Sequence, residues 1–365
     1  MGHQPRLLVL DANCLSYIDL LTGMELQRTA LQLPGCGALQ NFISIMMDGP
    51  CEHTCLGTNG NHIYICRQKP PGVGKDYVLP RPEVLCFSCK DLSKVGTAAE
   101  LRWDDDDDDE GEEKEETCMG LTFSKGCMHI AMSDGHIRRM APHPDGFTFK
   151  CPEHASSPDD IYKLPSIGNS PMGVDPSCMA TGPDGNLYIV ANEDREGDEG
   201  NFGGPFRNRR SYIMVGNLGA TGAILSVKPF CGLSDNLVQP SGLCFDDQGN
   251  LYVTCITKRV LQYSGPLAVN PGQFMRVAAQ WTVPSHDLRN TEKYFPHDVK
   301  WHKGIKGIGS QAEPLLLVVR QHGDWQCRLA IFSAVSGQLL KELSFPHEQD
   351  SLAPDEFSEK YILVD

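Results

Sequence analysis

The feature that most constrains the fold is a unit that occurs more than once along the chain. Residues 240–255 read PSGLCFDDQGNLYVTC, and residues 176–190 read PSCMATGPDGNLYIV. In both segments a proline and a serine precede a short apolar run, a turn rich in Asp, Gly and Asn, and a second apolar run. Short apolar runs on either side of such a turn are typical of two antiparallel strands. The sequence therefore predicts a repeated β-unit.

Weaker copies lie before and after these two. Residues 118–132 read CMGLTFSKGCMHIAM, residues 296–301 read PHDVKW, and a degenerate copy begins near Thr54. HIRRM (136–140) and RVLQY (259–263) match each other as third strands. The units start about 60 residues apart, so 365 residues hold six of them. Because such units become stable only when they pack against one another in a ring, we predict one all-β propeller domain, residues 1–365, with six blades. Seven blades are the alternative if an insertion hides a further unit.

The two ends of the sequence predict how the ring closes. LLVLDANCLSYIDLLTG, near the N-terminus, matches the second and third strands of a unit without a first strand. KYILVD (360–365) is a short strand pattern with nothing after it. We expect this last strand to supply the missing strand of the first blade, which would cover an open sheet edge.

The pattern PSGLxFDxxGNLYV resembles the NHL-type repeat. It also resembles the wider group of six-bladed propellers that includes gluconolactonase-like and senescence-marker-like lactonases and the peptidyl amidating lyase. The match is good over residues 118–140, 176–191 and 240–263. Propellers host many functions, so the resemblance specifies a fold better than an activity.

In propellers of this kind the first strand of each unit lines a central channel, and its start lies at one mouth. Polar groups that converge on such a concavity are the default binding site. Aligning the units places these residues at the mouth: His53, Thr54, Met119, Ser177, Ser241, His297 and Asp298 in the ring, with Asn13, Asp134, Asn192, Glu193, Lys258, His322 and Asp324 nearby.

The resemblance also bears on a divalent metal, zinc or calcium. Lactonase-like relatives hold a metal with carboxylate and asparagine oxygens, but Ser177, Ser241 and His297 stand at the matching positions here. FPHDV (295–299) resembles the amidating lyase, in which this histidine holds zinc and the aspartate takes part in the site. His297 and Asp298 are therefore the candidate metal ligands, with His53 a speculative second histidine. Catalytic zinc needs three protein ligands, so the set is incomplete.

Two insertions interrupt the units. DDDDDDEGEEKEE (104–116) repels itself and is expected to be a disordered loop, with a low-affinity cation or basic-partner site as the alternative. Residues 193–211 form a Gly- and Arg-rich insertion, expected as a surface loop or as a lid that contacts a partner.

Charge and cysteine usage limit the partners. The net charge of −15 disfavours binding to nucleic acid and to anionic membranes. The arginine cluster at 207–210 is the one feature that favours RNA binding. Fifteen cysteines without an export signal indicate reduced thiols in a cytoplasmic protein, and no apolar run is long enough to cross a membrane. We expect a monomer.

Together these features predict an NHL-like propeller that binds a protein or a small ligand at its mouth face. The alternative is a metal-dependent hydrolase or lyase with a remodelled site that uses His297 and Asp298. The two differ in whether His53, His297 and a carboxylate such as Glu193 or Asp298 meet within about 2.0–2.2 Å of one ion.

Overall fold

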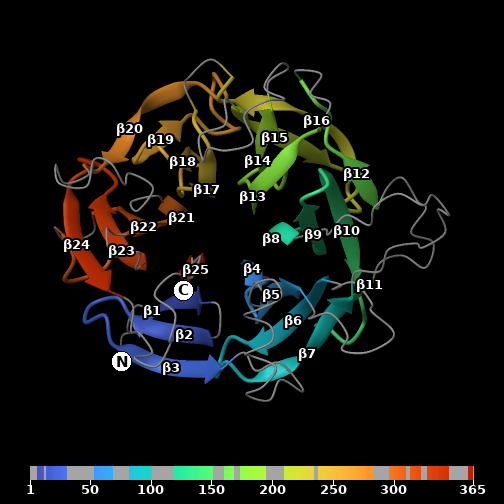
Figure 1. Ribbon diagram of the computed structural model, residues 1–365, viewed down its shortest axis with the longest axis horizontal. Helices are drawn as coiled ribbons and strands as arrows, with labels where there is room; N and C mark the ends of the chain where they lie inside the picture. Colours follow the sequence, from blue (N-terminus) through green and yellow to red (C-terminus); the bar gives the residue numbers. More distant parts are fainter. Residues whose placement is uncertain are drawn as a thin grey trace, which may run out of the picture.

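Six antiparallel sheets stand around a central axis like the blades of a propeller (Figure 1). The structure is a computed structural model. It describes residues 6–11, 14–30, 53–68, 82–100, 118–150, 160–167, 173–194, 209–233, 237–282, 296–309, 313–321, 327–344 and 361–364. Over these residues no helix is long and apolar enough to cross a membrane. The predicted all-β propeller with six blades is confirmed, and the seven-bladed alternative is not what forms.

The first three blades are formed by the N-terminal half of the chain and by its last strand. Blade 1 contains β1 (Arg6–Asp11), β2 (Cys14–Asp19), β3 (Glu25–Ala30) and β25 (Tyr361–Val364). Blade 2 contains β4 (His53–Thr58), β5 (His62–Gln68), β6 (Pro82–Ser88) and β7 (Lys94–Glu100). Blade 3 contains β8 (Cys118–Ser124), β9 (Cys127–Met132) and β10 (His136–Pro142), and two short strands, β11 (Phe149–Lys150) and β12 (Ile161–Lys163), share its outer position.

The other three blades each have four consecutive strands. Blade 4 contains β13 (Asp175–Thr181), β14 (Leu187–Asp194), β15 (Arg209–Leu218) and β16 (Ile224–Cys231). Blade 5 contains β17 (Pro240–Phe245), β18 (Leu251–Cys255), β19 (Arg259–Tyr263) and β20 (Phe274–Gln280). Blade 6 contains β21 (Pro296–His302), β22 (Leu315–Gln321), β23 (Cys327–Ser333) and β24 (Leu339–Ser344).

The last strand closes the ring. β25 pairs antiparallel with β1, with Leu7 opposite Val364 and Leu10 opposite Tyr361, and it takes the innermost place in blade 1 (Figure 1). The N-terminal strands are accordingly the second, third and fourth of their blade. The closure predicted from KYILVD is therefore confirmed.

Hydrogen bonds to an aspartate in the turn between the first two strands of a blade explain why the pattern of acid, asparagine and tyrosine recurs in the sequence. Asp246 Oδ1 accepts the backbone N–H groups of Gln248 (3.0 Å) and Asn250 (2.7 Å). Its Oδ2 accepts the side-chain N–H of Asn250 (2.9 Å) and the hydroxyl of Tyr252 (3.2 Å). In blade 4 the acid stands two positions later in the turn, where Asp184 accepts bonds from the backbone and side chain of Asn186 and from the hydroxyl of Tyr188. The acid, the amide and the tyrosine of the motif thus fix one hairpin.

The core lies between blades rather than within one blade. Alternate residues of a strand point to opposite faces, so each middle strand contributes to two interfaces. In β1, Leu8 packs toward blade 2, whereas Leu7 packs toward blade 6. Among the described residues there is one apolar cluster at each of the six junctions. Each blade is therefore stabilised by its two neighbours.

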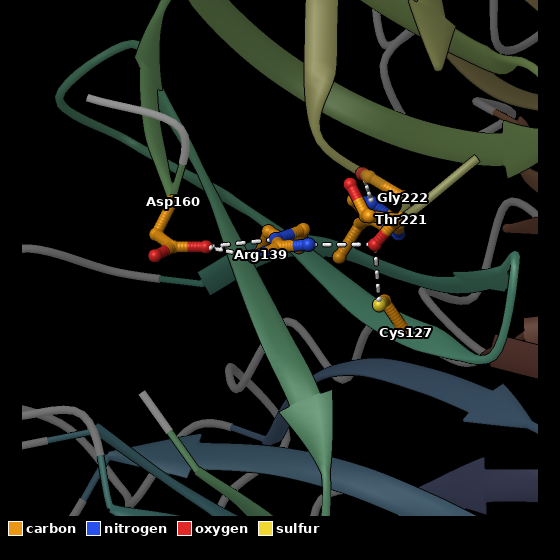
Figure 2. Close-up of polar contacts among 6 residues, drawn as sticks. Cys127, Arg139, Asp160, Thr221 and Gly222 are labelled. Carbon is orange, nitrogen blue, oxygen red and sulfur yellow. Dashed lines mark hydrogen bonds and ion pairs between the residues drawn. The ribbon is translucent and has the colours of Figure 1, made fainter. Parts of the chain in front are cut away.

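Polar contacts reinforce the junction between blades 3 and 4 (Figure 2). Arg139 on β10 donates from Nε to Asp160 Oδ1 (2.7 Å) and from Nη1 to the carbonyl of Thr221 (2.6 Å), in the turn between β15 and β16. The Cys127 thiol also donates to the Thr221 carbonyl (3.3 Å). Gly222 has a φ of +81° in this turn, and a Cβ there would lie 2.9 Å from the Cys127 sulfur. The turn thus fits against blade 3 only with glycine at this position.

His129 makes this junction sensitive to acid. The ring is buried, its Nε2 lies 2.9 Å from the carbonyl of Gly222, and burial lowers its pKa. A histidine with a lowered folded-state pKa takes up its proton more readily in the unfolded chain, so stability falls as pH drops below the unfolded value of about 6.5. We expect the free energy of unfolding to fall more steeply between pH 7 and pH 5 for the wild type than for His129→Gln. Urea unfolding at several pH values measures this slope, and equal slopes would rule out the contribution.

The cysteines are consistent with the sequence analysis. The nine cysteines whose side chains the structure describes are free thiols, and seven of them are buried. They behave as small apolar side chains within the blade junctions. Burial raises the pKa of the Cys86 thiol to about 11, which keeps it protonated at neutral pH.

Candidate functional site

The candidate site is a ring of β-bulges where the innermost strands begin, the end of the ring that the sequence analysis predicts to be the channel mouth and that we call the mouth. In five blades the register between the first and second strands shifts by one residue at the start of the first strand. The extra residues are Thr54, Met119, Ser177, Ser241 and His297. A bulge redirects one side chain and often lies next to a functional site. These are the ring positions expected from aligning the repeats, and the register confirms that they are equivalent.

Two of these residues join neighbouring inner strands. Ser177 Oγ donates to the carbonyl of Pro240 (3.0 Å), and Ser241 Oγ donates to the carbonyl of Pro296 (2.7 Å). Each serine therefore bonds to the proline that begins the next inner strand. Gly242 directly follows the bulge at Ser241 and lets β17 and β21 approach each other, because a Cβ there would lie 2.8 Å from the Cα of Asp298. The predicted ligand-binding serines thus hold the mouth in shape.

Asn192 belongs to a closed circuit of hydrogen bonds between blades 4 and 5. The backbone N–H of Gln239 donates to Ser211 Oγ (3.2 Å), whose hydroxyl donates to Asn192 Oδ1 (2.8 Å). Asn192 Nδ2 donates to Ser177 Oγ (3.3 Å), whose hydroxyl donates to Pro240, the residue after Gln239. Each side chain in the circuit both donates and accepts. Such a network fixes the geometry of the mouth.

Removing the amide of Asn192 tests this circuit. Asn192→Ala leaves the hydroxyls of Ser177 and Ser211 without their shared partner, so we expect a loss of about 1–3 kcal/mol in the free energy of unfolding. Asn217→Ala is the matched control, because Asn217 bonds Ser226 (2.9 Å) at an exposed position of the same blade. That control should change stability by less than about 0.5 kcal/mol. Urea unfolding measures both, and equal effects would contradict a structural role for the circuit.

Glu193 is buried beside this circuit. Its Oε1 accepts the hydroxyl of Ser166, and its Oε2 accepts the hydroxyl of Tyr212 (3.4 Å). Burial and then the Glu193 carboxylate raise the pKa of Tyr212, so the phenol stays protonated and remains a donor. Glu193 also belongs to β14, opposite Arg210 of β15.

The strand pair that contains Glu193 is longer than the sequence analysis expected. β14 continues to Asp194 and β15 begins at Arg209, although residues 193–211 were expected to form a loop insertion. Acids on one strand stand opposite arginines on the other, with Glu193 paired to Arg210 and Asp194 to Arg209, which favours continued pairing. Residues 195–208 lie outside the described residues, as does the acidic segment 104–116.

The carboxylate of Asp298 forms an ion pair with Lys300. Its Oδ1 accepts the ammonium of Lys300 (2.8 Å) and the backbone N–H of Val299 (2.8 Å). Burial lowers the pKa of Lys300, but the Asp298 carboxylate and weaker contributions from two thiols raise it by more. Lys300 therefore stays charged and neutralises the carboxylate that was predicted to bind a metal.

The described residues do not complete a metal site around His297 and Asp298. Within them, no three His, Cys, Asp or Glu side chains come close enough together to hold an ion. His297 is half-buried at its bulge, and its neighbour Asp298 already binds Lys300. The side chain of His53, and all of His322 and Asp324, lie outside the described residues. Their part in a ligand or metal site stays a prediction.

Several residues of the site have no signal in the sequence. Ser211 lies at the end of an insertion, and Thr254 is an interior residue of β18 whose hydroxyl lies 3.1 Å from Ser241 Oγ. Neither residue recurs at the matching position of the other units. Lys300 could have been found, because it follows Asp298 by two residues in PHDVKW, and residues two apart in a strand share a face.

Comparison with known proteins finds similar solved structures, all of low sequence identity to this chain. The chain matches no known protein-family profile, and no curated protein is similar to it in sequence. It is similar in structure to a protein of unknown function from Bacteroides caccae (12% identity, 94% of each chain covered, TM-score 0.49). It is also similar to a luciferin-regenerating enzyme (12% identity, 86% of this chain and 90% of that chain, TM-score 0.48). A third similar structure is apo AztD from Citrobacter koseri (11% identity, 99% and 98% covered, TM-score 0.46).

Proposed function

We propose that this chain is an NHL-like propeller that binds a protein partner or a small ligand at its channel mouth. The bulge ring carries this proposal. It brings five residues of four types to one rim, namely Thr54, Met119, Ser177, Ser241 and His297. A structural ring would need only one repeated residue type at these positions, whereas recognition needs different ones.

The rigidity of the mouth supports recognition. Ser177 and Ser241 join successive inner strands, and the circuit through Asn192 joins blades 4 and 5. Side chains held on strands by such bonds lose little further conformational entropy when a partner binds. The mouth is therefore preorganised.

The strand ends around the mouth support a binding surface as well. In each blade the first strand starts at the mouth and the second strand ends there, because neighbouring strands are antiparallel. The longest connections in the sequence join strand ends on this side: residues 31–52 follow β3, residues 101–117 follow β7 and residues 345–360 follow β24. Connections that differ between blades are where propellers gain specificity.

The alternative, a metal-dependent hydrolase or lyase, has less support. It needs at least three protein ligands, and His297 and Asp298 gain no third one among the described side chains.

The free thiols agree with the cytoplasmic compartment proposed from the sequence, and the net charge of −15 agrees with a monomer that binds neither nucleic acid nor anionic membrane.

Retention of partners on the immobilised protein tests the proposal. Two mouth variants, Met119→Arg and His297→Ala, are compared with Met24→Arg and His62→Ala, which alter an exposed and a half-buried residue at the opposite ends of strands. Proteins and metabolites retained by the wild type should fall at least about tenfold on the mouth variants and stay unchanged on the controls. Equal retention on all variants, or no retention above an empty matrix, would overturn the proposal.

A further inference from the structure

We propose that the outer edge of blade 5 binds an extended, acidic and apolar segment of a partner protein as an added β-strand. β20 is the outermost strand of its sheet, pairing with β19 on one side and with no other described strand. A strand at an edge presents unpaired backbone N–H and C=O groups to another chain. This edge lies on the outer wall, away from the bulge ring (Figure 1).

The wall around β20 is apolar and exposed. Phe274, Met275 and Val277 of β20 keep 41%, 51% and 39% of their surface exposed. In the connection that precedes β20, Leu267 is 72% exposed and Val269 is 97% exposed. Contiguous exposed apolar groups of this kind mark interaction sites.

The other outer strands carry the residues that normally protect an edge. β16 contains Lys228 and Pro229, β3 contains Glu25 and Arg28, and β7 begins with Lys94. Charged side chains and proline discourage a further strand from pairing. β20 has neither proline nor acid, and its single charged residue is Arg276.

Arg276 is engaged inside the protein rather than guarding the edge. Its guanidinium donates to Gln262 Oε1 (2.7 Å) and to the carbonyls of Val335 (2.9 Å) and Ala334 in the next blade. Phe274 packs edge-on against Tyr263, with ring centroids 5.8 Å apart. The edge is therefore held in one conformation, which lowers the entropic cost of adding a strand.

The charge around this edge selects the partner. The sequence has no Asp or Glu from residue 248 to residue 286, although the whole chain carries a net charge of −15. The acceptors of Arg276 are a side-chain amide and two carbonyls, so they leave its positive charge uncompensated, and Arg259 of β19 lies opposite Gln280 of β20. A second copy would place this basic wall against itself, whereas a segment with acidic residues beside alternating apolar ones matches it.

A library of random 12-residue peptides displayed on phage is the probe. The full chain is compared with Val277→Lys, which places a charge on the edge, and with Leu225→Lys on β16 as the matched control, because Leu225 is 70% exposed. Enriched peptides should alternate apolar residues and contain acids. A synthetic copy should bind Val277→Lys at least about tenfold more weakly and Leu225→Lys within about twofold.

Strand addition is distinguished from side-chain docking by the backbone. Two synthetic peptides are N-methylated, one at its odd-numbered residues and the other at its even-numbered residues. One of them should lose binding and the other should keep it, because only one of the two sets of amides faces β20. No enrichment, binding that ignores Val277→Lys, enrichment of basic peptides or indifference to N-methylation would each overturn the proposal. Self-association of the chain in sedimentation that is lost in Val277→Lys would assign the edge to a second copy instead.

Discussion

Deleting residues 361–365 is expected to abolish cooperative folding. The deletion removes β25 and uncovers the inner edge of β1, where Leu8, Val9 and Leu10 are almost fully buried. Each such side chain contributes about 1.5–3 kcal/mol when fully buried. The loss approaches the whole stability of a domain, about 5–15 kcal/mol. Calorimetry should show no sharp unfolding transition, and the protein should aggregate through its open edge.

Two controls separate ring closure from a general effect of shortening the chain. Removing Asp365 alone leaves β25 in place and should melt like the wild type. Adding a synthetic peptide with the sequence of residues 360–365 to the deleted protein should restore part of the transition, whereas a scrambled peptide should not. A deleted protein that melts like the wild type would show that β25 does not hold the ring together.

Arg139→Ala is expected to cost about 3 kcal/mol, because it leaves the buried carboxylate of Asp160 without its guanidinium partner. It also frees the Thr221 carbonyl, which Arg139 binds across the junction in Figure 2. Urea unfolding at pH 7 measures the loss. The matched control is Arg28→Ala, which breaks a more exposed ion pair with Glu25 (3.0 Å) and should cost at most about 1 kcal/mol.

The double variant Arg139→Ala/Asp160→Asn tests the cause. Without a charge at position 160 there is no carboxylate to leave unpaired, so the double variant should be more stable than the sum of the two single losses predicts. Strict additivity, or a cost of Arg139→Ala no larger than that of Arg28→Ala, would show that the ion pair does little to hold blades 3 and 4 together.

The repeat was predictable because each unit contains its own hairpin chemistry. Asp246, Asn250 and Tyr252 bond one another within a few residues, so the same letters return wherever the same turn forms. The unit starts predicted near 118, 240 and 297 fall within one residue of β8, β17 and β21. The closing strand followed from counting strands at the two ends.

The site was less predictable because its bonds cross between blades. Aligning the units placed Ser177 and Ser241 at the mouth, but nothing local shows that their hydroxyls bind the prolines of the next blades. Each bulge is the second or third residue of its strand, so too few residues precede it for the shift in alternation to show in the sequence. The neutralisation of Asp298 by Lys300 is the exception, because residues two apart in a strand share a face and the spacing stands in the sequence.

The pairing of β1 with β25 also sets the order of events during synthesis. Residues 7–10 leave the ribosome long before their inner partners, residues 361–364. Blades 2 to 6 can assemble as their strands emerge, while blade 1 waits with one edge unpaired until residues 361–364 emerge. Until then the nascent chain carries an open strand edge that other chains can pair with, and we expect it to depend on chaperones that hold open strands.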